Sequence, residues 1–328
     1  MFSFHSSYSQ QFAMPLFQSA RLLAKPNRLF GGKDAWKYLF RSLPIYPWSR
    51  HWANYLLKHD KFRQLLQLQP RLLFKLQRPY LRKEVSIEQK LSWLREHYDW
   101  LLAHWPWTFL HKLYQLGRIE LARIGGEDGQ PVYHLVLRPT DQCDKEGDLM
   151  LVLECAHQPL AIISFTVHRV GAEWVVSIGC LQGPRPELGR EAVKIATQQM
   201  HGLRPKQAVL TALYALAAGY GIGRLHAVCN DSHIYQTRWR RRNRIAADYD
   251  SFWREMGGSR VDDSFHLPDR LARKAVADIP SRKRAQYRRR HQLEDSMIAS
   301  LQTVLPACDR SRPIFTQAII DQTGPSAD

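Results

Sequence analysis

The stretch PLAIISFTVHRVGAEWVVSIGCLQG, residues 159–183, decides the fold of this 328-residue chain. Two apolar runs rich in β-branched residues flank the dipeptide Gly171-Ala172, which is typical of a tight turn. We expect the two runs to form long neighbouring strands. Shorter runs of the same kind precede them and predict a meander of about five antiparallel strands; they occupy residues 119–124, 131–139 and 148–155.

Helical patterns alternate with short strands after the meander. Residues 187–202 and 204–222 read as helices, the second with Pro205 near its start. A strand is expected at 223–230, a short helix at DYDSFW and a short strand at 264–268. This order of elements is that of the GCN5-related N-acetyltransferase fold, in which a splayed pair of strands admits an acyl-CoA. The comparison concerns the order of elements alone, and fold does not carry function with it.

Residues before the meander are helical and rich in aromatic and basic side chains. Ser86 and Gln89 form a capping-box pattern ahead of an apolar face at helical spacing. The expected fold class is therefore α+β, with a helical domain followed by an antiparallel-sheet domain. The expected segments are a loosely ordered leader at 1–34, the helical domain at 35–116, the acetyltransferase-like domain at 117–270, a basic helix at 271–301 and a tail at 302–328.

The chain carries 47 Lys and Arg against 30 Asp and Glu, a net charge of +17. Residues 1–95 alone hold 17 basic and 4 acidic residues, a net of +13. An anionic partner fits this excess, whether a phosphorylated small molecule, a lipid headgroup on a membrane surface or a nucleic acid. A general solubility role for the charge is the simpler alternative. Apolar content of 45% excludes a wholly disordered chain.

Five cysteines are scattered along the chain without CxxC spacing. This pattern disfavours a disulfide framework and a zinc ribbon, so we expect no metal site. The first residues lack the basic and apolar regions of a secretory signal, and no segment reaches the about 18 apolar residues of a spanning helix. A cytoplasmic location is expected, with peripheral association at the inner membrane as the alternative.

Two glycine-containing motifs predict an anion site. SIGCLQGPRP ends a strand at residue 186, and MHGLRPKQ opens the helix that includes Pro205. Backbone N–H groups at a helix start favour an anion, although the same glycines and prolines also suit plain turns. The pyrophosphate-loop pattern of acetyltransferases is absent, so acyl-CoA is a candidate without its usual signature, and no cofactor is certain. The expected anion-binding residues are Gln182, Gly183, Arg185, Arg204, Lys206, Arg238 and Arg284.

Tyr249 and His233 are the candidate catalytic residues. Trp253 occupies the place where acetyltransferases often carry a tyrosine acid, and Tyr249 lies one helical turn earlier. His233 lies in NDSH, which equally suits a capped turn. The simpler interpretation is that Tyr249, Phe252 and Trp253 form the packed face of a short helix. The residues expected to support the pocket are Asn230, Asp248, Trp253 and Tyr287.

Two basic stretches combine arginine with an aromatic residue. RWRRRNR, residues 238–244, and RKRAQYRRRH, residues 282–291, suit phosphate contact and base stacking. No recognised nucleic-acid-binding module accompanies them. Aromatic and cationic residues also alternate in the first helices, which favours contact with an anionic membrane. A helical bundle with solvated Lys and Arg is the alternative reading of that pattern.

Four motifs together resemble the VirK/YbjX family of Gram-negative bacteria: SIGCLQGPRP, MHGLRPKQAVLTAL, DYDSFWREMGG and IPSRKRAQYRRRHQL. The similarity spans about residues 35–301, and RPYL and REHYDWL extend it to the helical region. It implies a protein linked to envelope stress, antimicrobial-peptide resistance and surface display of a virulence protein, with unknown biochemistry. The matching residues are Gln182, Gly183, Gly202, Arg204, Pro205, Asp248, Tyr249, Trp253, Arg284, Tyr287 and Arg290.

Three functions follow from these patterns. The first is an acyltransferase-like enzyme, or a binder of an anionic ligand related to the cell envelope. The second is a non-catalytic peripheral membrane or partner-binding protein. The third is an RNA-binding post-transcriptional factor.

Overall fold

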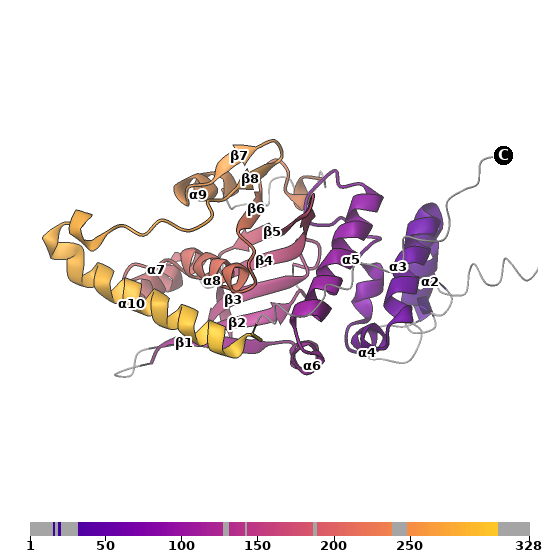
Figure 1. Cartoon of the computed structure of the whole chain (residues 1–328), viewed down its shortest axis with the longest axis horizontal. Helices are drawn as coiled ribbons and strands as arrows, with labels where there is room; N and C mark the ends of the chain where they lie inside the picture. Colours follow the sequence, from indigo (N-terminus) through magenta and orange to yellow (C-terminus); the bar gives the residue numbers. More distant parts are fainter. Residues whose placement is uncertain are drawn as a thin grey trace, which may run out of the picture.

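The computed structural model describes residues 32–126, 131–141, 143–185, 189–237 and 248–307, together with Leu16, Ser19 and Ala20. These residues form helices around one mostly antiparallel sheet of eight strands, so the α+β class is confirmed (Figure 1). The basic stretch expected at 238–244, the part of the expected tail after residue 307 and most of the leader lie outside the described residues.

Helices make up the chain before the sheet. Ser86 accepts a hydrogen bond from the Gln89 backbone N–H and starts the longest of them, as its capping pattern predicted. Gly117, at φ +69°, ends the last one in the left-handed conformation. The helices are α2 (Gly32–Ser42), η1 (Leu43–Ile45), α3 (Tyr46–Lys58), α4 (Asp60–Leu68), η2 (Pro70–Phe74), α5 (Ile87–His104) and α6 (Trp107–Leu116).

The sheet runs in the order β1-β2-β3-β4-β5-β6-β8-β7. All neighbours are antiparallel except β5 and β6, which are parallel. The five-strand meander is therefore confirmed, and β7 is a short strand that the sequence did not reveal. The strands are β1 (Ile119–Gly125), β2 (Val132–Pro139), β3 (Leu149–Cys155), β4 (Gln158–Val170), β5 (Glu173–Gln182), β6 (Arg224–Val228), β7 (Ser259–Val261) and β8 (Ser264–His266).

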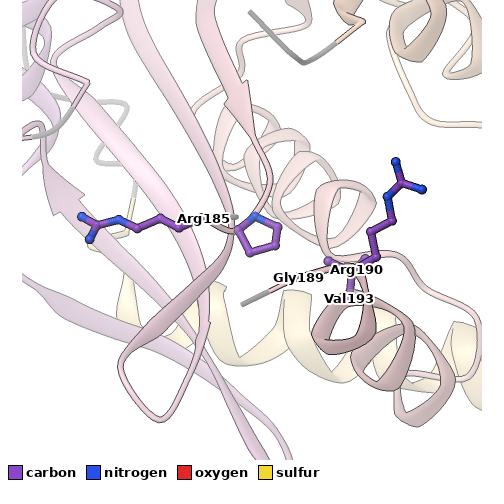
Figure 2. A pocket seen from close by; sticks show the side chains of 5 residues that line it. Arg185, Gly189, Arg190 and Val193 are labelled. Carbon is purple, nitrogen blue, oxygen red and sulfur yellow. The ribbon is translucent and has the colours of Figure 1, made fainter. Parts of the chain in front are cut away.

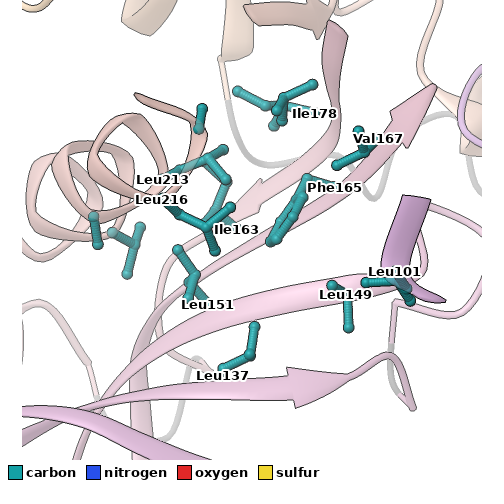
Figure 3. Packing of buried hydrophobic residues seen from close by; sticks show 14 of the residues in the cluster. Leu101, Leu137, Leu149, Leu151, Ile163, Phe165, Val167, Ile178, Leu213 and Leu216 are labelled. Atoms are coloured by element: carbon teal, nitrogen blue, oxygen red, sulfur yellow. The ribbon is translucent and has the colours of Figure 1, made fainter. Parts of the chain in front are cut away.

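Later helices connect and cover the strands: α7 (Gly189–Gln199), α8 (Pro205–Gly219), α9 (Tyr249–Glu255) and α10 (Ser281–Val304). Figure 1 shows α7, α8 and α10 across one side of the sheet, and α5 with the earlier helices at the ends of the strands. Figure 3 shows Leu213 and Leu216 of α8 pointing toward Ile163 and Phe165 of β4. This apolar contact holds α8 on the sheet.

A buried ion pair joins the helical region to the sheet. Lys75 Nζ lies 2.9 Å from Asp148 Oδ1, and both side chains are almost fully buried. Tyr80 and Tyr98 also donate hydrogen bonds to the Asp148 carboxylate. One continuous hydrophobic cluster runs from Trp52 in α3 to the sheet residues. The helices before residue 117 and the sheet therefore share a core.

The pairing of β5 with β6 ends before β5 does, because β6 ends at Val228. The two strands pair only from Val175 to Ile178 on β5, although β5 continues to Gln182. The last four residues of β5 consequently have no neighbour from β6. We call residues 179–182 the free half of β5, and the side chains of the candidate site lie beside them.

Candidate functional site

A loop between β2 and β3 crosses directly over β5. A Cβ atom at Gly179 would lie 2.1 Å from the Glu146 carbonyl oxygen, so only glycine fits there. At Gly147 a Cβ atom would lie 2.6 Å from Ser164 Oγ. These two glycines allow the loop 143–147 to lie against the strands, and they bring its side chains to the free half of β5.

Two cysteines and a glutamate meet where this loop crosses. Cys143 Sγ lies 3.7 Å from Cys180 Sγ. One ligand atom each of Cys143, Glu146 and Cys180 lies within 4.8 Å of the others, and all three residues are buried. Burial, together with the neighbouring Cys143 and Glu146, raises the pKa of the Cys180 thiol well above its usual value. We call these three residues the thiol–carboxylate cluster.

His233 and Tyr249 adjoin the cluster. His233 Nε2 lies 3.0 Å from Glu146 Oε1 and 3.4 Å from the Tyr249 hydroxyl. The rings of His233 and Tyr249 stack, with centroids 5.1 Å apart. Burial raises the pKa of Tyr249 well above its usual value, so its hydroxyl keeps its proton at neutral pH and can donate it. The structure thus brings the two candidate catalytic residues together, both of them buried.

The segment after Tyr80 contacts both segments that form the site, which are the loop 143–147 and the turn with Ser232 and His233. Leu81 donates its backbone N–H to the Lys145 carbonyl at 2.7 Å, and Lys83 donates to the Ser232 carbonyl at 2.9 Å. Arg82 also forms a β-bridge with His233. Leu81 of the RPYL motif, with Arg82 and Lys83 directly after it, therefore connects the loop 143–147 to the turn that carries His233.

Lys206, one of the expected anion ligands, interacts electrostatically with Cys180 of the cluster. It lies in the first turn of α8, and its Cε would be 3.8 Å from a Cβ atom at Gly183. Burial lowers the pKa of Lys206, while the nearby Cys180 acts in the opposite direction. Gln182 ends β5, next to Gly183. An ammonium group, a glycine and a helix start therefore lie together at the end of β5, an arrangement that suits an anion.

The expected arginines have other partners or positions. Arg204 pairs with Glu255 of α9, and its guanidinium lies over the Phe252 ring. Arg185 lines a hollow between the end of β5 and α7, together with Arg190. Figure 2 shows the side chains of Arg185 and Arg190 pointing away from each other. These two arginines therefore do not converge on one anion.

Three of the four expected supporting residues fix α9 beside β6. Asn230 accepts the Tyr249 backbone N–H at 2.7 Å and donates to Asp248 Oδ1 at 2.9 Å. Asp248 is the N-cap of α9, and its hydrogen bonds from Ser251 and Asn230 lower its pKa to about 2. Trp253 donates its indole N–H to the Val228 carbonyl. The packed face expected from Tyr249 and Trp253 is confirmed, since both are buried.

Two expected site residues lie on α10 and make local contacts in the described part of the chain. Arg284 donates to the carbonyl oxygens of Ile279 and Ala277, just before α10. The Tyr287 ring makes an edge contact with His291. Arg290 donates to the Gly202 carbonyl at 3.4 Å and connects α10 to the turn before α8. Arg238 lies outside the described residues.

Sequence reasoning missed the thiol–carboxylate cluster. Cys143 and Cys180 are 37 residues apart, and no spacing rule relates them. The signals that could have found them are Gly147 and Gly179, because glycines next to chemically active side chains indicate a close approach of two backbones.

A second surface feature lies on α2. Trp36 and Phe40 are 71% and 76% exposed, and Leu43 follows one turn later at 65%. The basic residues between them are also exposed, namely Lys33, Lys37 and Arg41. The other aromatic side chains of this region, such as Tyr38 and Trp52, are buried in the bundle. Among the described residues, no helix combines the length and apolarity needed to span a bilayer.

The relatives found are described as uncharacterised proteins. The Escherichia coli K12 "Uncharacterized protein YbjX" is 35% identical over 272 residues, covering 82% of each chain. Two proteins of Haemophilus influenzae, each described as "Uncharacterized protein", are 32% identical over 127 residues and 29% identical over 169 residues. These matches cover 38% and 51% of this chain, and 42% and 56% of the Haemophilus proteins.

No solved structure matches the chain. The model of the family described as "Protein of unknown function (DUF535)" matches residues 29–303. Together with the similarity to the Escherichia coli protein, this match confirms the family that the motifs indicated. The chain belongs to the DUF535 family, the VirK/YbjX family of its sequence motifs.

Proposed function

We propose that the chain is an acyltransferase-like enzyme that binds an anionic ligand at the end of β5. The observation that carries the proposal is the contact of Tyr249 and His233 beside the free half of β5, with Lys206 at the adjoining start of α8. A proton donor, a second proton-transfer group and a cation at one strand end are the groups that acyl transfer requires.

The topology supports the same reading. A meander leads through α7 and α8 to a parallel strand, and an antiparallel pair completes the sheet. The acetyltransferase fold holds its acyl donor between two strands that separate, and here β5 continues past the end of its pairing with β6. Here Tyr249 and Trp253 fill the space beside β6, so the ligand has to enter from the end of β5 near Gly183.

Each side chain has a definite role in the proposed transfer. His233 Nε2 takes the proton of the attacking hydroxyl or amine as its oxygen or nitrogen bonds to the acyl carbon. The bond from the acyl carbon to the leaving sulfur breaks, and the Tyr249 hydroxyl gives its proton to that sulfur. The proton on His233 then returns to Tyr249 across their 3.4 Å contact, which restores both residues. Lys206 holds an anionic group of the ligand.

Binding of acyl-CoAs to the full chain tests this proposal. We expect acetyl-CoA or a longer acyl-CoA to raise the melting temperature, with Lys206→Ala weakening binding about tenfold or more. Lys194→Ala, on the exposed side of α7, is the matched control and should bind as the wild type does. Tyr249→Phe keeps the ring packing and should bind the donor but lose turnover. Absence of any thermal shift with acyl-CoAs at millimolar concentration would exclude the function.

A second function, contact with an anionic membrane surface, is favoured by α2. Its exposed Trp36 and Phe40 are about one helical turn apart, and the exposed Leu43 follows in η1. The neighbouring Lys33, Lys37 and Arg41 are also exposed. Aromatic side chains insert at the headgroup level, and Lys and Arg pair with anionic lipids. The helical-bundle alternative accounts for the buried aromatics of this region but not for these exposed ones.

Vesicle flotation tests whether α2 contacts an anionic membrane. We expect the full chain to float with vesicles containing phosphatidylglycerol and not with phosphatidylcholine alone, and salt should weaken the binding. The double variant Trp36→Ser/Phe40→Ser should lose flotation. Leu116→Ser, which removes a 58% exposed leucine from α6, should retain it. Equal flotation of the double variant and the wild type would exclude α2 as the contact.

A further inference from the structure

We infer that Cys143, Glu146 and Cys180 form a binding site for a divalent transition-metal ion, with zinc as the best match. The inference needs only these three donors, so it stands apart from the proposed acyl transfer. The scattered cysteines gave no indication of such a site, because its ligands come from a loop and from the end of a distant strand.

The positions of the donor atoms fit one bound ion. Zinc binds thiolate sulfur at about 2.3 Å in tetrahedral geometry, which places two such sulfurs about 3.8 Å apart. The observed separation of Cys143 Sγ and Cys180 Sγ is 3.7 Å. A Glu146 oxygen completes a set in which all three atoms lie within 4.8 Å of one another. The two sulfurs therefore match one bound zinc ion, and a small movement of the Glu146 side chain would bring its oxygen to the same ion.

The Glu146 carboxylate gives a second and independent indication. Its side chain is almost fully buried, and neither of its oxygens accepts a hydrogen bond in the part of the chain that the structure describes. His233 Nε2 is 3.0 Å from Oε1, but not in hydrogen-bond geometry. A buried carboxylate normally has hydrogen bonds or a cation, because burial of an unpaired charge is costly. An ion at this position would satisfy it.

The donor set identifies the class of ion. Calcium and magnesium prefer sites made of oxygen alone, whereas thiolates select zinc and related softer metals. Two sulfurs and one carboxylate leave a fourth position on zinc. A water molecule can fill that position, so the site needs no ligand from His233. Binding releases a proton from each thiol.

The surrounding structure pre-organises the site. Gly179 and Gly147 allow the loop to lie against β5 and β4, and the Glu146 N–H donates to the Cys143 carbonyl at 2.9 Å. Apolar side chains enclose the two sulfurs from the strand side, namely Val136, Met150, Val152 and Ile162. Exclusion of water by these side chains strengthens the attraction between the ion and its ligands.

The test is the metal content of the full chain, purified under reducing conditions without a chelator. We expect elemental mass spectrometry to find about one zinc ion per chain. Replacement by cobalt should give the thiolate-to-metal absorption and the visible bands of a tetrahedral site. Cys143→Ser, Cys180→Ser and Glu146→Gln should each lower metal content strongly. Cys155→Ser, which alters a cysteine outside the cluster at the end of β3, should leave it unchanged.

If a serine variant fails to fold, measurements on the wild-type protein still decide the test. Removal of the metal with a chelator should lower the melting temperature, and addition of zinc should restore it. Two results would overturn the inference. One is a reduced wild-type chain that takes up neither zinc nor cobalt at micromolar concentration. The other is a mass two hydrogens lower without bound metal, which would assign Cys143 and Cys180 to a disulfide. Neither result bears on acyl-CoA binding.

Discussion

Gly179 has no space for a side chain, because the Glu146 carbonyl would lie 2.1 Å from its Cβ atom. Gly179→Ala should therefore displace the loop 143–147 and lower the free energy of unfolding by about 2 kcal/mol or more. Gly223→Ala is the matched control, because no atom lies within 4 Å of its Cβ position. Urea unfolding of the two variants checks this prediction, and equal stabilities would contradict it.

Lys75 neutralises a carboxylate in the interior. Lys75→Met removes the counter-charge of Asp148 and should cost about 3–5 kcal/mol of stability, since the charge that remains is buried and unpaired. Arg123→Met removes an exposed partner of Glu120 and should cost less than about 1 kcal/mol. Comparison of the two midpoints in urea measures the difference. A loss of similar size at both positions would exclude this account of Lys75.

Single residues were unequally predictable. Tyr249 and His233 could be selected because their types and their place after the meander suggested proton transfer, and the structure brings them together. Their catalytic role stays a prediction. Glu146 gave no signal, because its importance comes from burial beside side chains that are distant in sequence. Arg204 was expected to bind an anion, yet its guanidinium already has a carboxylate partner in Glu255.

At the scale of elements, α9 is positioned by its N-cap residue, Asp248. Asp248 caps α9 through Ser251 and also accepts from Asn230, so Asp248→Ala should cost about 0.5–2 kcal/mol. Asp248→Asn should cost less, because an amide oxygen can still accept the cap hydrogen bond. Thermal unfolding of both variants tests the order. A more stable alanine variant would show that the cap does not hold α9.

Elements with strong periodic patterns were predicted well. The β-branched runs gave the meander, and the capping pattern at Ser86 gave the start of α5. The strand β7 was missed because SRV has three exposed residues without an apolar alternation, and its pairing with β8 alone defines it. The aromatic–basic pattern of the first helices could not show which face is buried, and packing against the bundle left Trp36 and Phe40 outside.

For the whole molecule, buried histidines make stability depend on pH. Burial lowers the pKa values of His97 and His168 to about 4, below their ordinary value of about 6.5. Between these values the unfolded chain binds more protons than the folded chain, so stability is complete above pH about 6.5 and falls as pH drops toward 4. Each histidine contributes at most about 1.4 kcal/mol per pH unit.

Unfolding free energies at several pH values check this slope. His168→Gln should reduce it, because one buried imidazole no longer competes for protons. The same substitution at the exposed His51 controls for loss of an imidazole elsewhere. A slope that is unchanged in His168→Gln would assign the pH dependence to other groups.

Local sequence determined the helices and strands of this protein, and its motifs identified the family. Periodicity, turn residues and caps act over a few neighbours, so the helices, the meander and the motif residues could be read directly. Only the tertiary structure decided which polar groups are buried together. The meeting of Cys143, Glu146 and Cys180, the pairing of Lys75 with Asp148 and the exposure of Trp36 depend on contacts between distant segments. Burial changes the energy of a charged or polar group far more than its sequence neighbours do, which is why the candidate site was only partly visible in the sequence.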